Sequence, residues 1–149
     1  MQTQSIALDR RLALILVLIF AGAVAIAAQH QHDAAVHHHP AAAKIKNPVA
    51  SSAASIAAGE QLYVKHCSEC HGDTGKGDGE MGEEMDPKPA NLTDAEWKHG
   101  SSDGEIYTVI RNGVKSTGMK AFAKKLTVHQ VWDVVNYLRT LGPRPAKSH

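Results

Sequence analysis

The sequence predicts a small all-α domain, and three observations support that fold class. Apolar side chains near the end of the chain recur at the spacing of an α-helix, and they are Val128, Val131, Trp132, Val135, Leu138 and Leu141. Ser102 with Glu105 and Thr127 with Gln130 have the spacing of capping boxes, which mark helix starts. No segment combines the alternation of a strand with turn residues at both ends.

The first 28 residues carry the pattern of an export signal. An arginine pair at positions 10 and 11 precedes an uncharged apolar run over residues 12–28, and the small residues of 25–27 suit a cleavage site. The run also reaches the lower limit for a membrane span, so an uncleaved anchor remains open. Both alternatives predict a periplasmic protein, either free or tethered to the outer face of the inner membrane.

Residues 29–52 are rich in alanine and histidine and show no apolar period, which predicts a flexible linker. Its histidines are His30, His32, His37, His38 and His39. Neutral imidazoles could bind copper, zinc or nickel here, and the alternative is a solvated spacer. The folded domain is predicted over residues 53–143, and residues 144–149 are predicted to form a disordered tail.

The run Cys67-Ser68-Glu69-Cys70-His71 has the spacing of covalent c-type haem attachment. Two thiols one helical turn apart can form thioethers with one porphyrin, and the next imidazole can bind the iron. The chain has two cysteines, so a four-cysteine zinc site is excluded, and no histidine pair follows at finger spacing. We therefore predict one covalent haem c, with Cys67 and Cys70 as the thioether links and His71 as an axial ligand.

A domain of roughly ninety residues has a thin core, and at this size a cofactor or another covalent staple is usually needed. A buried haem would supply the missing apolar volume. We therefore predict that the domain without haem is unfolded or molten.

The segments around the motif follow in order. A first helix is predicted to run past Gly59 into the cysteine motif, with Ser55 or a neighbour as its cap, and glycine inside a helix predicts close approach by another helix. The glycines of residues 72–79 predict successive turns with positive φ. This part of the chain is also acidic and is predicted to be either a solvated face or a docking patch; its acidic residues are Asp73, Asp78, Glu80, Glu83, Glu84 and Asp86. The helix that starts after Ser102 is predicted to end at Gly113.

The second axial ligand decides the chemistry of the iron. A filled His/Met site favours outer-sphere electron transfer, whereas an open site would bind small molecules. The candidates by residue type are Met81, Met85, Met119, His99 and His129. Met119 lies in a segment between two capped helices, where a methionine is easier to explain as a ligand than as packing, but the residues alone leave the choice open.

The sequence resembles the class I cytochromes c over about residues 53–142. The motifs that carry the resemblance are Gly59, Tyr63, Cys67-Ser68-Glu69-Cys70-His71, Gly75 to Gly79, Pro87-Lys88-Pro89-Ala90-Asn91-Leu92-Thr93, Gly113, Gly118-Met119 and Trp132 to Leu141. The resemblance implies a cytochrome c-like helical domain wrapped around one haem, with Met119 as the distal ligand. Lys120 stands where the family usually has proline, which implies a less rigid ligand loop.

The resemblance also implies roles for residues around the haem. Gly59, Tyr63 and Tyr137 would mark the crossing of the first and last helices. Tyr63, Pro87 and Pro89 would line the haem pocket, and one of the two prolines would orient His71 through its backbone carbonyl.

These observations predict a one-electron carrier and not an enzyme. The alternatives are a haem-based ligand binder or sensor and a tethered cytochrome subunit of a larger oxidoreductase complex. Redox donor and acceptor proteins are the predicted partners, either docking on a ring of lysines or meeting ordinary surface lysines; the four are Lys115, Lys120, Lys124 and Lys125. The formal net charge of +1 argues against a nucleic-acid partner, and membrane contact is predicted only through a retained N-terminal segment.

Overall fold

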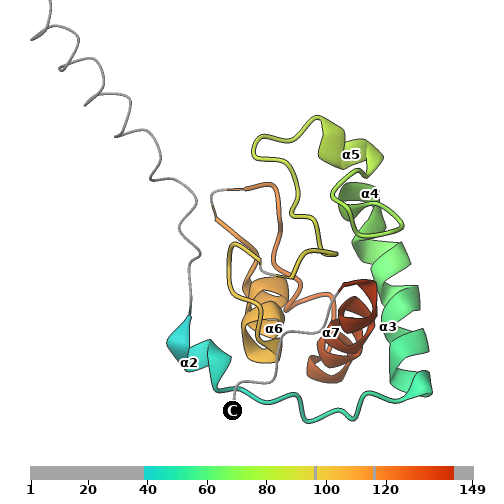
Figure 1. The fold of residues 1–149 in the computed structure, drawn as a ribbon, viewed down its shortest axis with the longest axis vertical. Coiled ribbons are helices and arrows are strands. Elements are labelled where there is room, and N and C mark those ends of the chain that lie inside the picture. Colours follow the sequence, from blue (N-terminus) through green and yellow to red (C-terminus); the bar gives the residue numbers. More distant parts are fainter. Residues whose placement is uncertain (1–38, 96, 116, 143–149) are drawn as a thin grey trace, which may run out of the picture. The chain divides into compact units, whose positions relative to one another are not determined.

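The computed structural model describes residues 39–95, 97–115 and 117–142, and every regular element in these ranges is a helix. The elements are α2 (Pro40–Ala43), α3 (Ala53–His66), α4 (Ser68–His71), α5 (Glu80–Glu83), α6 (Asp103–Asn112) and α7 (Val128–Leu141) (Figure 1). The predicted all-α fold is confirmed. The predicted signal or anchor, the first ten residues of the predicted linker and the predicted tail lie outside the described residues. None of the helices in the described ranges has the length and hydropathy of a membrane span.

The crossing of α3 and α7 organises the domain (Figure 1). Gly59 lies so close to α7 that a Cβ there would overlap the backbone carbonyl of Asp133 and lie 2.9 Å from the Cβ of Tyr137. One turn later Tyr63 is fully buried, with its ring centroid 5.2 Å from that of Tyr137. The expected crossing at these residues is confirmed.

Helix α6 packs on a second side of α7 (Figure 1). The rings of Tyr107 and Trp132 stack with centroids 4.0 Å apart and planes inclined by 10°, and Arg139 forms an ion pair of 2.7 Å with Asp103. The core side chains that fill the space between the three long helices are Tyr63, Ile106, Ile110, Val131, Val134, Val135 and Leu138. Helices α6 and α7 thus pack together as one wall of the space beside the cysteine motif.

The helix ends follow the sequence pattern, with one difference. Both predicted capping boxes are present, at the starts of α6 and α7, and Gly113, with φ of 65°, ends α6. Helix α3 is capped by Ser52, whose hydroxyl accepts from the amide of Ser55. Ser55 itself is buried and donates to the carboxylate of Asp133 at 2.6 Å, so its hydroxyl binds α7 and does not cap its own helix.

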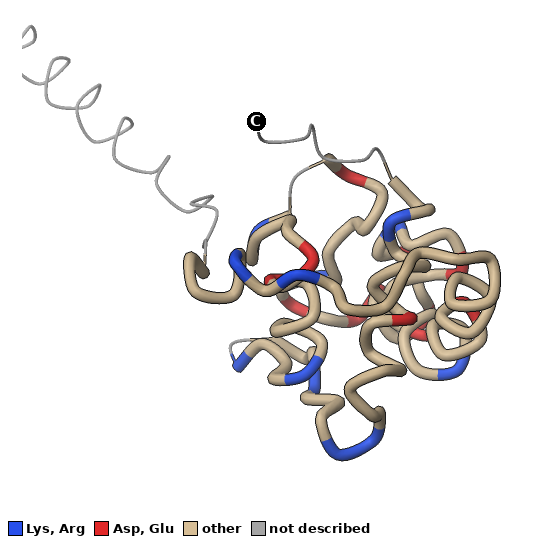
Figure 2. The backbone as a smooth tube through the Cα atoms, turned by 90° about the horizontal axis from the view of Figure 1, so that it is seen from below, with Lys and Arg blue, Asp and Glu red and all other residues tan. Residues whose placement is uncertain are grey.

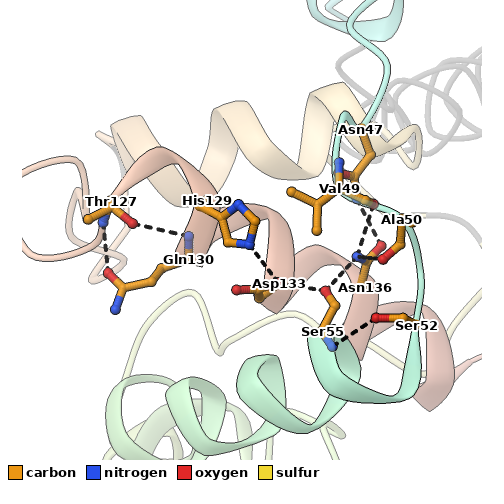
Figure 3. Close-up of polar contacts among 10 residues, drawn as sticks. All are labelled: Asn47, Val49, Ala50, Ser52, Ser55, Thr127, His129, Gln130, Asp133 and Asn136. Atoms are coloured by element: carbon orange, nitrogen blue, oxygen red, sulfur yellow. Dashed lines mark hydrogen bonds and ion pairs between the residues drawn. The ribbon is translucent and has the colours of Figure 1, made fainter.

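Residues 39–50, which we call the N-terminal strap, pack on the domain although they fall in the predicted linker. The amide of His39 donates to the Glu105 carboxylate at 2.9 Å. The amide groups of Asn47 and Asn136 are joined by a bond of 2.8 Å, and Asn136 also donates to the carbonyl of Val49 at 3.2 Å (Figure 3). Polar groups of α6 and α7 thus satisfy backbone groups of the strap, which a composition-based prediction of a linker does not register.

Candidate haem site

A cavity of about 490 Å³ lies between the cysteine motif, α6, α7 and the loops that join them. This volume falls within the range of ligand pockets, about 300–1,000 Å³. Most of its wall is apolar, and the core residues that contribute are Tyr63, Leu92, Ile106, Ile110, Val134 and Leu138.

The structure brings all the predicted site residues to this cavity, and they are Tyr63, Cys67, Cys70, His71, Pro87, Pro89 and Met119. Of the other candidate ligands, Met85 and His99 also line it. Met81 is 48% exposed on α5, and His129 lies on α7 with its Nε2 3.7 Å from the Asp133 carboxylate (Figure 3). Neither of these two lines the cavity.

The two cysteines lie at the junction of α3 and α4. Cys67 follows the last residue of α3, and Cys70 is one turn on, within α4. Both are free thiols and half-buried. Burial raises the pKa of the Cys67 thiol to about 12, and Cys70 beside it adds to the shift. A reactive redox dithiol needs the opposite shift, toward the thiolate, so this environment does not suit a thioredoxin-like pair.

His71 is oriented by a backbone carbonyl. Its Nδ1 lies 3.1 Å from the carbonyl oxygen of Ala90, and because a carbonyl can only accept, Nδ1 carries the proton and Nε2 keeps its lone pair. A metal-binding histidine is usually fixed in this way. Burial lowers the pKa of His71, against the opposing effect of the Ala90 hydrogen bond, which favours the neutral imidazole that binds iron.

The expectation that Pro87 or Pro89 supplies this carbonyl is wrong. The carbonyl of Pro89 packs against Gly77, where a Cβ would lie 2.5 Å from its oxygen. Gly77 has φ of 80°, and its missing side chain allows this approach. The extended proline segment therefore turns the next carbonyl, that of Ala90, toward His71.

The glycine-rich loop wraps the end of α4. Gly72, Gly75 and Gly77 all have φ between 76° and 80°, which confirms the predicted turns at these positions. At Gly79 the prediction of a positive φ is wrong, because its φ is -69° and it precedes α5 in an extended conformation. The Tyr63 hydroxyl donates to the carbonyl of Gly72 at 2.6 Å, and the amide of Leu92 donates to that of Gly75 at 2.6 Å. Burial, more than the nearby anionic groups, raises the pKa of Tyr63, so the phenol stays a neutral donor beside the cysteine motif.

Met119 lies in the segment between α6 and α7, whose described residues 113–115 and 117–123 we call the Met119 loop. Its carbonyl accepts from the amide of Val114 at 3.0 Å, and its own amide donates to the hydroxyl of Thr117 at 3.1 Å. The amide of Phe122 returns to the last turn of α6 at the Ile110 carbonyl. The methionine side chain is partly buried against the core, so a tight loop presents it to the cavity.

Trp97 was missed from the sequence, whereas Met85 was named there among the candidate iron ligands. Trp97 lines the cavity and donates through its indole nitrogen to the carbonyl of Asp94 at 3.0 Å. Met85 lines it as well, with its sulfur against Gly118. For Trp97, a large side chain in a segment without helical period was the available signal.

The four predicted docking lysines are exposed, and they are Lys115, Lys120, Lys124 and Lys125. Toward the lower edge of Figure 2 the coloured segments of the chain are all basic. Lys88 and Lys98, also exposed, line the cavity itself.

The residues present fit a haem c. Two thiols at the attachment spacing, a histidine with a free Nε2 and a methionine sulfur surround one cavity whose wall is mostly apolar. These are the donor types that hold the iron of a cytochrome c, and an apolar wall suits the porphyrin.

Comparison with known proteins agrees with a cytochrome c domain. Residues 54–138 match the family described as cytochrome c oxidase, cbb3-type, subunit III. The cbb3-type cytochrome c oxidase subunit FixP of Bradyrhizobium diazoefficiens is 35% identical over 58% of this chain and 27% of its own length. Subunit CcoP of Rhodobacter capsulatus is 34% identical over 60% of this chain and 30% of its own length. The chain therefore spans less than a third of these curated relatives.

Solved structures give the same fold. The Kuenenia stuttgartiensis reducing HAO-like protein complex Kustc0457/Kustc0458 contains a chain that superposes with a TM-score of 0.60 at 29% identity, over 66% of this chain and 50% of that one. Cytochrome CL of Methylophaga aminisulfidivorans, at 23% identity and a TM-score of 0.50, shares the fold over 63% of this chain and 55% of its own. The chain thus belongs to the cbb3-type cytochrome c oxidase subunit III family, as a cytochrome c domain.

Proposed function

We propose that the protein is an exported one-electron carrier with a single haem c, attached through Cys67 and Cys70 and ligated by His71 and Met119. The observation that supports this function is the presence of these four side chains around one mostly apolar cavity. When bound, the haem supplies one-electron exchange between iron(II) and iron(III).

The residues of the chain restrict the site to electron transfer. The Ala90 carbonyl holds the His71 ring in the tautomer that leaves Nε2 for the iron. Met119 would supply the second iron ligand when haem is bound, and this would leave no position on the iron for a substrate. The apolar wall excludes water and disfavours the extra positive charge of the oxidised state, which raises the potential.

The Met119→Ala variant tests the carrier function. We expect the oxidised wild-type holoprotein to show a weak far-red absorption band that is lost in this variant, because the band reports the iron–sulfur bond. The Met81→Ala variant is the control, since Met81 is exposed and away from the cavity. A band that persists in Met119→Ala, or carbon monoxide binding to ferrous wild type at neutral pH, would contradict the proposal and favour a ligand binder.

The lysines around the Met119 loop are proposed to steer an acidic redox partner. We expect oxidation of the ferrous protein by the anionic oxidant ferricyanide to slow with rising salt, because exposed charges are screened. Replacing Lys120, Lys124 and Lys125 by glutamine should slow the reaction several-fold at low salt and flatten the salt dependence. Glutamine at the exposed Lys44 and Lys46 is the control. A rate that does not change with salt would contradict the proposal that these lysines steer the partner.

A tethered subunit of an oxidase complex is the second candidate. The family description and the names of the relatives favour it, although the chain spans only part of their length. In either case the domain is proposed to lie in the periplasm. The mass of the mature protein decides between cleavage and retention of residues 1–28, and co-purification of the retained form with a haem–copper oxidase from native membranes would support the subunit.

A further inference from the structure

The side chain of Met85 lines the cavity and contacts a second segment that also lines it. It follows α5, where its amide donates to the carbonyl of Gly82 at 3.2 Å. Its thioether then reaches the Met119 loop: a Cβ built on Gly118 would lie 3.0 Å from the Met85 sulfur and 3.1 Å from its methyl carbon. Gly118 directly precedes Met119, so Met85 touches the backbone that carries the proposed ligand.

This contact joins two segments that lie far apart in the sequence. Among the described residues, no hydrogen bond or ion pair connects residues 80–90 with residues 113–123. The hydrogen bonds that fix Met119 come from Val114 and Thr117 of its own loop. Packing by Met85 is therefore a contact that ties the ligand loop to the segment following the cysteine motif.

The residue types suit this contact. An unbranched, polarisable thioether adapts to an irregular surface, and Gly118 offers bare backbone with no side chain between. Lys120 follows Met119, so no proline ring stiffens the loop after the methionine. A loop without that restraint gains more from a side chain that packs against it from outside.

We propose that Met85 is a positioning residue for Met119. By packing on Gly118 it keeps the Met119 loop closed, and so it sets the strength of the iron–sulfur bond without binding the iron itself. The inference rests on the proposed function, in which Met119 is the distal ligand.

The test measures imidazole binding to the ferric holoprotein, because imidazole must displace the distal ligand. Its apparent affinity is set by the fraction of molecules with an open loop. We expect Met85→Ala to keep the far-red band and to raise the imidazole affinity by about threefold to tenfold. Met85→Leu, which conserves volume, should restore most of the wild-type affinity. Met81→Ala, on the same segment but exposed, should leave it unchanged.

Gly118→Ala approaches the same contact from the other side. A methyl group at this position enters the space of the Met85 sulfur, so we expect it to raise the imidazole affinity on its own. In the double variant Met85→Ala, Gly118→Ala the space is free again, and the two effects should combine to less than their sum. Additive effects would overturn the proposal, because they would mean that the two residues act independently.

The outcomes separate this inference from the proposed function. If Met119→Ala loses the band while Met85→Ala binds imidazole as wild type does, the positioning role fails and the carrier function stands. If Met119→Ala keeps the band and Met85→Ala loses it, Met85 is the ligand and both proposals fail as stated. Loss of the band only in Met119→Ala, with raised imidazole affinity in Met85→Ala, supports both.

Discussion

Tyr63 links the helix crossing to the loop that follows His71. Its ring is fully buried against Tyr137, while its hydroxyl binds the carbonyl of Gly72. That carbonyl also accepts from the amide of Gly75, so removal of the hydroxyl leaves it with one partner.

We therefore expect Tyr63→Phe to lower the free energy of unfolding of the holoprotein by about 1–1.5 kcal/mol, measured by guanidinium titration. Tyr107→Phe is the matched control, because the Tyr107 hydroxyl is half-buried and accepts from Arg111; its cost should stay within about 0.5 kcal/mol. Equal losses in both variants would show that the Gly72 hydrogen bond has no special weight.

The same residue predicts a pH dependence. Burial raises the pKa of Tyr63 above its ordinary value of 10.0, so the folded state keeps a proton that the unfolded state loses. The stabilisation is fully present below pH 10 and falls as the pH rises further. Above pH 10 the difference in stability between wild type and Tyr63→Phe should therefore shrink, in the same titration repeated at several pH values.

The orientation of His71 shows where residue-level prediction ends. The cysteine motif identifies His71 from spacing alone, and the prolines of residues 87–89 indicate an extended segment nearby. The carbonyl that reaches the ring belongs to Ala90, because that of Pro89 packs against Gly77. Which carbonyl faces inward depends on backbone dihedrals after the prolines, and these leave no mark in the residue types.

Among the elements, α3 carries a residue whose effect reverses the usual propensity. Alanine is favoured over glycine inside a helix by about 1 kcal/mol. At Gly59, however, a Cβ would overlap the carbonyl of Asp133 on α7, and overpacking costs about 1–3 kcal/mol. We expect Gly59→Ala to lower the thermal midpoint of the holoprotein, measured by calorimetry. Ala57→Gly, on the exposed side of α3, gives the size of the propensity effect alone, and a Gly59→Ala variant as stable as wild type would rule out the close crossing.

Helices α3, α6 and α7 were predictable because their signals are local, whereas the four-residue helices α2, α4 and α5 were not predicted. The capping boxes at Ser102 and Thr127 and the glycine at 113 fix helix ends from residues a few positions apart. The strap and the contact of Met85 with Gly118 were not predictable, since each joins residues more than thirty positions apart without any periodic pattern. The long-range pairing of Asn47 with Asn136 likewise has no signal in a single sequence.

At the scale of the whole molecule, the cavity is large for the domain that contains it. Without haem, the mostly apolar wall of this cavity of about 490 Å³ would be exposed to water, which costs about 25 cal/mol per Å² of apolar surface. Whole domains of this size are stable by about 5–15 kcal/mol. We therefore expect the domain without its haem to have little stability.

The double variant Cys67→Ala, Cys70→Ala tests this balance, because it removes the covalent attachment. We expect it to lose its near-ultraviolet circular dichroism, to bind the dye ANS and to melt without a sharp transition. The wild-type holoprotein, measured alongside, should melt cooperatively. A sharp melt of the variant with native-like circular dichroism would mean that the helices alone suffice.

The N-terminal strap limits how far the domain can travel if residues 1–28 remain in the membrane. A free tether over residues 29–52 could extend to about 80 Å. Because residues 39–50 are bound to α6 and α7, only residues 29–38 are left, and ten residues reach about 34 Å at full extension. A tether of this length would confine electron transfer to partners that lie close to the same membrane surface.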